Sequence, residues 1–367
     1  MNLLSLSELY LGKKVLITGH TGFKGAWLAM MLRHLGATVV GYSLPPSTTP
    51  NLFELAELAH NLVHIEGDIR DYAHLKETIT THQPEIIFHL AAQAIVLDGY
   101  KSPKETFDVN SGGTVNVLEA LRHSPFTKAC ILVTTDKCYE NNDWSWGYRE
   151  NDVLGGKDPY SASKSMAELA IAAYRSSFFS ASHKNPPLIA SVRAGNIIGG
   201  GDFSPFRIIP DCMKALNQNE TIEIRNPNSA RPWLYVLDAL NGYLQLGGRL
   251  LQGDSTKADA WNFGPQENRA VTVQQLVEKA IAVWGKGNYK IHSQENQPRE
   301  MPFLRLSWDK AANELDWAPV YDWKEALEST VSWYRDYNEG MTISKLCDEQ
   351  ISSYFQEKSN EIYSYTS

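Results

Sequence analysis

Short apolar runs rich in β-branched residues alternate with longer helical patterns through the first half of the chain. This alternation limits the possible folds more than any other feature. The runs are Val15 to Thr18, Thr38 to Tyr42, Leu62 to Ile65, Ile86 to Leu90, Cys130 to Thr134 and Leu188 to Val192. Continuous apolar runs are typical of parallel strands that are buried on both faces. The sequence therefore predicts an α/β fold built on a doubly wound parallel sheet.

A glycine-rich segment joins the first predicted strand to a helix that begins near Ala26. It reads Gly19-His20-Thr21-Gly22-Phe23-Lys24-Gly25. Glycines permit a tight turn and a close approach of the backbone, and the free amides at a helix start attract a pyrophosphate. This context predicts a Rossmann-type dinucleotide site. His20 and Lys24 could also accommodate additional negative charge.

The alternation loosens after residue 192, where proline and glycine become frequent. We therefore expect a dinucleotide-binding domain over residues 1–192. A smaller mixed α/β substrate lobe is expected over residues 193–340, interleaved with the first domain, with strands at Thr221 to Ile224 and Trp261 to Phe263. Residues 341–367 are polar with scattered aromatics, and we expect a helix or a poorly ordered tail there.

Charge and composition exclude several classes of function. The formal net charge is −8, whereas a nucleic-acid surface needs a basic face, so no nucleic-acid partner is expected. No apolar run approaches the ~20 residues that span a bilayer, and residues 1–14 lack a signal-peptide pattern, so we predict a cytoplasmic protein. The four cysteines lie far apart, which predicts neither a disulfide framework nor a metal site.

Two groups of residues carry the predicted chemistry. Tyr160 and Lys164 stand at i and i+4, on one helix face. A free tyrosine has a pKa of about 10, and a nearby cation favours the phenolate, so the pair predicts a base usable near neutral pH. Thr135-Asp136-Lys137 follows the fifth predicted strand, and ligands of such sheets bind outside the carboxyl ends of the strands.

The spacing of the loop glycines resembles the extended short-chain dehydrogenase/reductase family. Asp68-Ile69 resembles the adenine-contacting segment of that family, Leu90-Ala91-Ala92 resembles the segment beside its cofactor, and Asn110 matches its N-x-x-G-T pattern, where a structural role is expected. The resemblance implies NAD as cofactor. Ser43 stands where an acid usually holds the ribose; it can bond a hydroxyl without repelling a 2′-phosphate, so NAD is favoured over NADP only moderately.

Within this family, Thr135 and Asp136 resemble the motif of the nucleotide-sugar 4,6-dehydratases, where Lys137 replaces the usual glutamate. Further segments, including Arg207-Ile208-Ile209-Pro210-Asp211 and Arg231-Pro232-Trp233, resemble the CDP-glucose branch, which serves deoxysugar and O-antigen biosynthesis. The resemblance implies that Tyr160 deprotonates the sugar 4-hydroxyl while Thr135 binds the oxyanion. Asp136 would then be the acid for water loss, and Lys137 either the C5 base or a countercharge to the enolate.

The resemblance also implies the substrate contacts and the assembly. Asn196 resembles a substrate-contacting residue, and Arg193, Arg207 and Arg231 are candidates for the diphosphate because a guanidinium matches phosphate oxygens. The helices predicted at 104–121 and 160–179 carry apolar residues on more than one side, which predicts a homodimer or homotetramer. A UDP-sugar 4-epimerase, a dehydratase of dTDP-glucose or GDP-mannose, and a non-catalytic nucleotide-binding protein remain alternatives.

Overall fold

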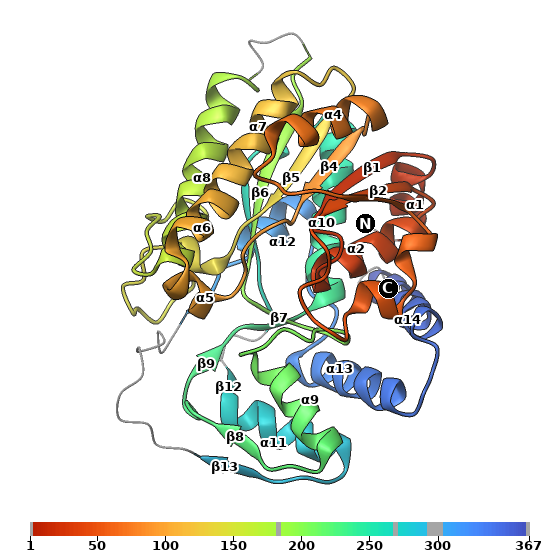
Figure 1. Cartoon of the computed structure of the whole chain (residues 1–367), viewed down its shortest axis with the longest axis vertical. Helices are drawn as coiled ribbons and strands as arrows, with labels where there is room; N and C mark the ends of the chain where they lie inside the picture. Colours follow the sequence, from red (N-terminus) through yellow and green to blue (C-terminus); the bar gives the residue numbers. More distant parts are fainter. Residues whose placement is uncertain (1–2, 181–184, 267–270, 292–303, 365–367) are drawn as a thin grey trace.

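A parallel sheet of seven strands forms the centre of the computed structural model, which describes residues 3–180, 185–266, 271–291 and 304–364 (Figure 1). The strand order is β11-β6-β5-β4-β1-β2-β3. The strands are β1 (Lys14–Thr18), β2 (Thr38–Ser43), β3 (Val63–Glu66), β4 (Ile86–His89), β5 (Ala129–Val133), β6 (Leu188–Ala194) and β11 (Ala260–Phe263). This arrangement confirms the predicted doubly wound sheet. The order reverses between β1 and β4, so a crevice is expected at the carboxyl ends of these strands.

Helices cover both faces of the sheet, because alternate strand residues point to opposite sides. Val15 and Ile17 of β1 pack into one apolar core, whereas Leu16 packs into another. The first core includes residues of α2 (Phe23–His34) and α10 (Val236–Leu251). The second includes residues of α4 (Tyr72–His82), α7 (Gly113–Arg122) and α8 (Pro159–Ser177).

The main sheet takes one strand from the sequence range expected for the second lobe. β11 pairs in parallel with β6, and all four of its residues are buried. Trp261 to Phe263 therefore belongs to the main sheet and not to the smaller lobe, contrary to the expectation from the sequence. A short buried strand carries no local signal of which sheet it will join, because its pairing partner lies far away in the sequence.

The smaller lobe lies below the sheet in Figure 1. It contains α9 (Ile208–Gln218), α11 (Val273–Trp284), α13 (Trp323–Asn338), and the paired strands β8 (Ile222–Ile224) and β13 (Tyr289–Ile291). Two further pairs join β7 (Asn196–Ile198) to β10 (Trp233–Tyr235) and β9 (Ala230–Arg231) to β12 (Val271–Thr272). These pairs position the segments that follow β6 beneath its carboxyl end.

The remaining elements are short, apart from the last helix. They are α1 (Leu3–Tyr10), α3 (Leu52–Leu55), η1 (Leu58–His60), α5 (Val96–Lys101), α6 (Pro103–Phe107), the π-helical turn η2 (Asp108–Gly112), η3 (Asp136–Cys138), η4 (Ser255–Lys257), α12 (Asp309–Leu315) and α14 (Ile343–Ser364). Of the two forms expected for the C-terminal segment, a helix is observed, and Ile351, Tyr354 and Phe355 of α14 are buried. Among the described residues, no helix has the length and apolarity to cross a membrane, and no cluster of side chains suits a metal ion.

Candidate active site

The glycine loop after β1 forms a tightly packed cradle with one open side. Gly19 has φ +80°, and a Cβ there would lie 2.7 Å from the backbone nitrogen of Ala91. A Cβ on Gly25 would lie 2.1 Å from the Gly19 carbonyl oxygen. Gly22, by contrast, is exposed and caps α2 without any side-chain hydrogen bond to the first amides. The loop therefore offers free amides on its open side, as a pyrophosphate requires.

The other predicted cofactor residues lie around this loop. The Ser43 hydroxyl is 2.8 Å from that of Thr21, and Thr21 also donates to the Leu44 carbonyl oxygen. Both carboxylate oxygens of Asp68 accept hydrogen bonds from the Arg70 guanidinium, and this contact lowers the pKa of Asp68. Among the other residues predicted to contact the cofactor, Ile69 is buried. The half-buried ones are Phe23, Lys24, Leu90, Ala91 and Ala92.

His20 does not supply the positive charge that the sequence analysis allowed. Its Nε2 lies 2.7 Å from Nδ1 of His64, and its ring meets Phe53 edge-on. Burial, followed by repulsion from His64, lowers the pKa of His20 to about 3. The side chain is therefore neutral near pH 7. Its position beneath the loop depends on Gly41, where a Cβ would lie 2.3 Å from the His20 ring.

Tyr160 and Lys164 lie together in the first turns of α8. Asp158 caps this helix by accepting a hydrogen bond from the Ser161 amide, and the Lys164 ammonium donates to the Val133 carbonyl oxygen at 3.2 Å. Burial raises the pKa of Tyr160 to about 12, although a hydrogen bond with Thr135 opposes this rise. Burial and then Lys24 lower the pKa of Lys164 to about 7.

These shifts differ from the expectation of a phenolate beside an ammonium near neutral pH. Both side chains are at least nine-tenths buried, and desolvation disfavours the charged form of each. The protein by itself therefore holds Tyr160 as a phenol. A negative group beside Lys164 would favour its ammonium form.

Thr135, Asp136 and Lys137 lie at the carboxyl end of β5, where the sequence places them. The Thr135 hydroxyl donates to Asp136 Oδ1 at 3.0 Å and caps η3 by accepting from the Lys137 amide. Asp136 is 2% exposed, whereas Lys137 is half-buried with its Nζ 4.0 Å from Asp136 Oδ1. The Thr135 contact with Tyr160 brings the two predicted catalytic groups together.

Segments after β6 form the other side of this site. A Cβ on Gly195 would lie 3.4 Å from Asp136 Oδ2, so the chain passes close to the carboxylate. Arg207 pairs with Asp202 at 2.8 Å. Burial and then Arg207 lower the pKa of Lys24 to about 8, while Asp136 raises it. Lys24 of the glycine loop thus lies within electrostatic reach of both Asp136 and Arg207 of the smaller lobe.

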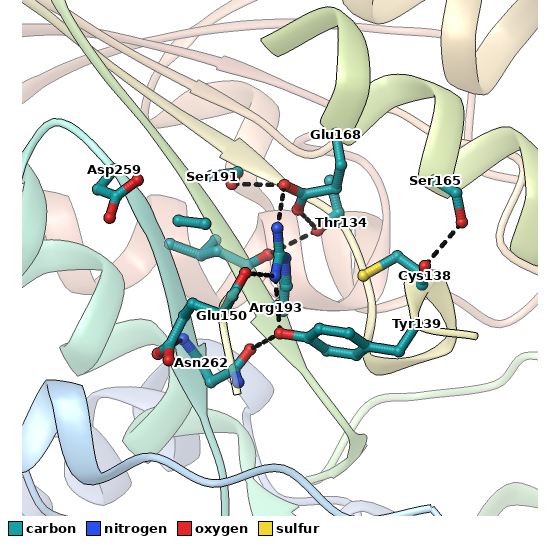
Figure 2. Close-up of polar contacts among 12 residues, drawn as sticks. Thr134, Cys138, Tyr139, Glu150, Ser165, Glu168, Ser191, Arg193, Asp259 and Asn262 are labelled. Carbon is teal, nitrogen blue, oxygen red and sulfur yellow. Dashed lines mark hydrogen bonds and ion pairs between the residues drawn. The ribbon is translucent and has the colours of Figure 1, made fainter. Parts of the chain in front are cut away.

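The predicted substrate-binding residues differ in their accessibility. Asn196 on β7 and Arg231 on β9 are half-buried. Arg193 is 3% exposed and pairs with Glu168 at 2.7 Å (Figure 2). The expectation that Arg193 could bind a diphosphate is wrong, because its guanidinium is enclosed by protein groups.

Sequence reasoning missed Glu168, although a signal was present. Glu168 stands four residues after Lys164 and so extends the same helix face. Asn110, in the π-helical turn, has the structural role expected of it. Its side chain bonds the backbone of Gln93 and the Ser163 hydroxyl, which ties the loop after β4 to α8.

Comparisons with known proteins agree with this geometry. The chain is 42% identical to CDP-glucose 4,6-dehydratase of Salmonella typhimurium over 94% of this chain and 96% of that protein. It is 25% identical to human dTDP-D-glucose 4,6-dehydratase over 88% of this chain and 90% of that protein. A crystal structure of dTDP-glucose 4,6-dehydratase from Bacillus anthracis shares the fold with a TM-score of 0.73 and 22% identity, covering 89% of this chain and 98% of that one. Residues 16–330 match the family described as GDP-mannose 4,6 dehydratase, and the chain belongs to this family of nucleotide-sugar 4,6-dehydratases within the extended short-chain dehydrogenases/reductases.

Proposed function

We propose that this chain catalyses the NAD-dependent dehydration of CDP-glucose to CDP-4-keto-6-deoxyglucose, as a hydro-lyase. The observation that carries the proposal is the buried hydrogen-bonded pair of Thr135 and Asp136 beside Tyr160. The pair places an acid, Asp136, beside Tyr160. Oxidation of an alcohol alone does not need such an acid, whereas loss of water does. The Salmonella relative, matched over nearly the whole chain, supports CDP-glucose as the substrate.

The glycine cradle fits a dinucleotide, since its open amides and its closely packed Gly19 and Gly25 leave room only on the ligand side. We assign the adenosine half of the cofactor to Thr21, Ser43 and Asp68. The 2.8 Å contact between the Thr21 and Ser43 hydroxyls beside the glycine loop supports this assignment. NAD, when bound, supplies reversible acceptance of a hydride, so oxidation and reduction can balance within one turnover.

The other steps of the reaction are assigned to four side chains. Tyr160 acts as a phenolate, which an ammonium form of Lys164 favours, and in that form it accepts the proton of the sugar 4-hydroxyl. Thr135 hydrogen-bonds the oxygen as charge develops there. The ketone at C4 acidifies the C5 hydrogen. Asp136 delivers a proton to the departing 6-hydroxyl, and Lys137, beside it, acts at C5 as the base or as a countercharge to the enolate.

The smaller lobe holds the nucleotide end of the substrate. Arg207 and Arg231 are the candidates for the diphosphate, and Asn196 for a sugar or ribose hydroxyl. We further propose that the protein acts in the cytosol as a homodimer or homotetramer. Exposed Met166 and Leu169 on α8 support an interface on that helix.

The assay that tests this function incubates the protein and NAD separately with CDP-glucose, UDP-glucose, dTDP-glucose and GDP-mannose. Products are read by the ultraviolet absorbance that 4-keto-6-deoxy sugars develop in alkali, and by mass. We expect rapid water loss from CDP-glucose. A 4-epimer of UDP-glucose without water loss would identify an epimerase instead, and no turnover of any sugar would favour a nucleotide-binding role.

A further inference from the structure

Glu168 and Arg193 form a buried ion pair next to the proposed catalytic groups. Arg193 Nη2 lies 2.7 Å from Glu168 Oε2, and each residue is only 3% exposed. Glu168 lies one helical turn beyond Lys164 on α8, whereas Arg193 lies on β6. Burying two charges carries a desolvation cost that their attraction does not reliably recover, so stability alone does not explain the pair.

Glu168 holds the end of β5 against α8. The Thr134 hydroxyl donates to Glu168 Oε1 (Figure 2), and Thr134 directly precedes Thr135. On the same helix, the Lys164 ammonium donates to the carbonyl oxygen of Val133. Val133 and Thr134 are thus bound to α8 immediately before Thr135, Asp136 and Lys137.

Arg193 holds the far end of the same segment. Its Nη1 donates to the Tyr139 hydroxyl at 2.7 Å, and that hydroxyl donates to Asn262 Oδ1 at 2.8 Å (Figure 2). Ser165, on α8, donates to the Cys138 carbonyl oxygen at 2.8 Å. Segment 134–139 is therefore fixed at both ends, by contacts that meet at the ion pair.

We propose that Glu168 and Arg193 are positioning residues, which hold segment 134–139 so that Asp136 and Lys137 face the substrate held at Tyr160. The proposal rests on the dehydratase function. Neither positioning residue touches substrate. They act through Thr134 and Tyr139, and their contribution is the alignment of one group of catalytic residues with another.

Loosening segment 134–139 is predicted to affect oxidation at C4 and loss of water unequally. Tyr160 and Lys164 belong to α8 and keep their places when segment 134–139 loosens. Asp136 and Lys137 belong to the segment and move with it. Thr135 moves with it too, but it assists oxidation through only one hydrogen bond. Loosening should therefore slow water loss more than oxidation at C4, and a displacement of about 1 Å can cost up to ~10²-fold in rate.

Two variants test the proposal in the full-length protein with NAD and CDP-glucose. Tyr139→Phe removes only the hydroxyl that Arg193 and Asn262 bind. Arg193→Lys keeps the charge opposite Glu168 but removes the planar fork that reaches Glu168 and Tyr139 together. Tyr10→Phe is the matched control, because Tyr10 is also fully buried and its hydroxyl donates to the Leu244 carbonyl oxygen.

Single-turnover mixtures are followed by the absorbance of reduced nicotinamide and by the mass of the sugar. In both variants we expect water loss about 10-fold slower, accumulation of reduced cofactor with a 4-keto sugar that retains its 6-hydroxyl, and an unchanged KM. Tyr10→Phe should behave as the parent does. If Arg193→Lys does not fold, Tyr139→Phe decides the question.

A parental ratio of oxidation to water loss in folded Tyr139→Phe would overturn the positioning role. So would the same accumulation in Tyr10→Phe, since that would show a general response to a lost buried hydrogen bond. The proposed function fails separately: it is refuted if the parent protein itself does not dehydrate CDP-glucose.

Discussion

Asp136 allows oxidation at C4 to be separated from loss of water. Asp136→Asn keeps the shape that accepts the Thr135 hydroxyl but cannot deliver a proton, a loss worth ~10²–10⁴-fold. We expect this variant to oxidise C4 and then accumulate reduced cofactor, measured by absorbance in a single turnover. Tyr160→Phe, in contrast, should bind the cofactor but accumulate neither reduced cofactor nor a 4-keto sugar. Elimination of water by Asp136→Asn at the parental rate would contradict the assigned role.

Lys164 makes the stability of the ligand-free protein depend on pH. Its pKa is about 7 in the folded protein, whereas an unfolded lysine has a pKa of ~10.4. Above pH 7 the unfolded chain binds more protons at this site, so the free energy of unfolding rises with pH through this window. Urea unfolding at pH 7 and pH 9 should show the parent gaining stability relative to Lys164→Met. If the free energy of unfolding changed equally with pH in both proteins, the pKa of Lys164 would not be lowered in the folded protein.

The sequence predicts those site residues whose neighbours along the chain define them. Tyr160 and Lys164 share a helix face, and Thr135 and Asp136 follow a strand directly, so local spacing is sufficient for both groups. Arg193 was misjudged because its environment comes from Glu168, which lies on another element. The pKa of Lys164 was also beyond sequence reasoning, since burial, rather than the neighbouring Tyr160, governs it.

At the scale of elements, α14 is part of the core rather than an appendage. Phe355 is 1% exposed and stacks on His34 of α2, with ring centroids 5.9 Å apart. Phe355→Ala should lower the free energy of unfolding by about 3–5 kcal/mol, measured by denaturant titration. Lys345→Ala, on the exposed side of α14, is the control and should change it by no more than about 0.5 kcal/mol. Equal effects of the two substitutions would mean that α14 does not pack as described.

Local patterns predicted the strands of the sheet well, but not every connection. The apolar runs gave β1 to β6 within a residue or two, because strands buried on both faces have a strong signature. The helix expected at 104–121 is divided by the π-helical turn η2, which turns Asn110 toward Gln93 and Ser163. Such a turn depends on contacts with other elements, which the sequence of the helix does not reveal.

At the scale of the whole molecule, α8 presents an apolar surface beside the helices that surround the site. Met166 is 49% exposed and Leu169 is 59% exposed. We expect these residues to be covered by a second copy of the chain, so sedimentation at micromolar concentration should show at least a dimer. Leu169→Lys should shift the protein toward monomer, because a charge would then lie in the interface. A parent that sediments only as a monomer would refute this assembly.

In the proposed mechanism, the hydrogen removed from C4 of the sugar is returned to C6 within one active site. CDP-glucose carrying deuterium at C4 tests this requirement most directly, with the product examined by mass and NMR spectroscopy. We predict that the deuterium appears at C6 of CDP-4-keto-6-deoxyglucose. Deuterium retained at C4 of an epimerised sugar, or lost to solvent, would contradict the dehydratase mechanism.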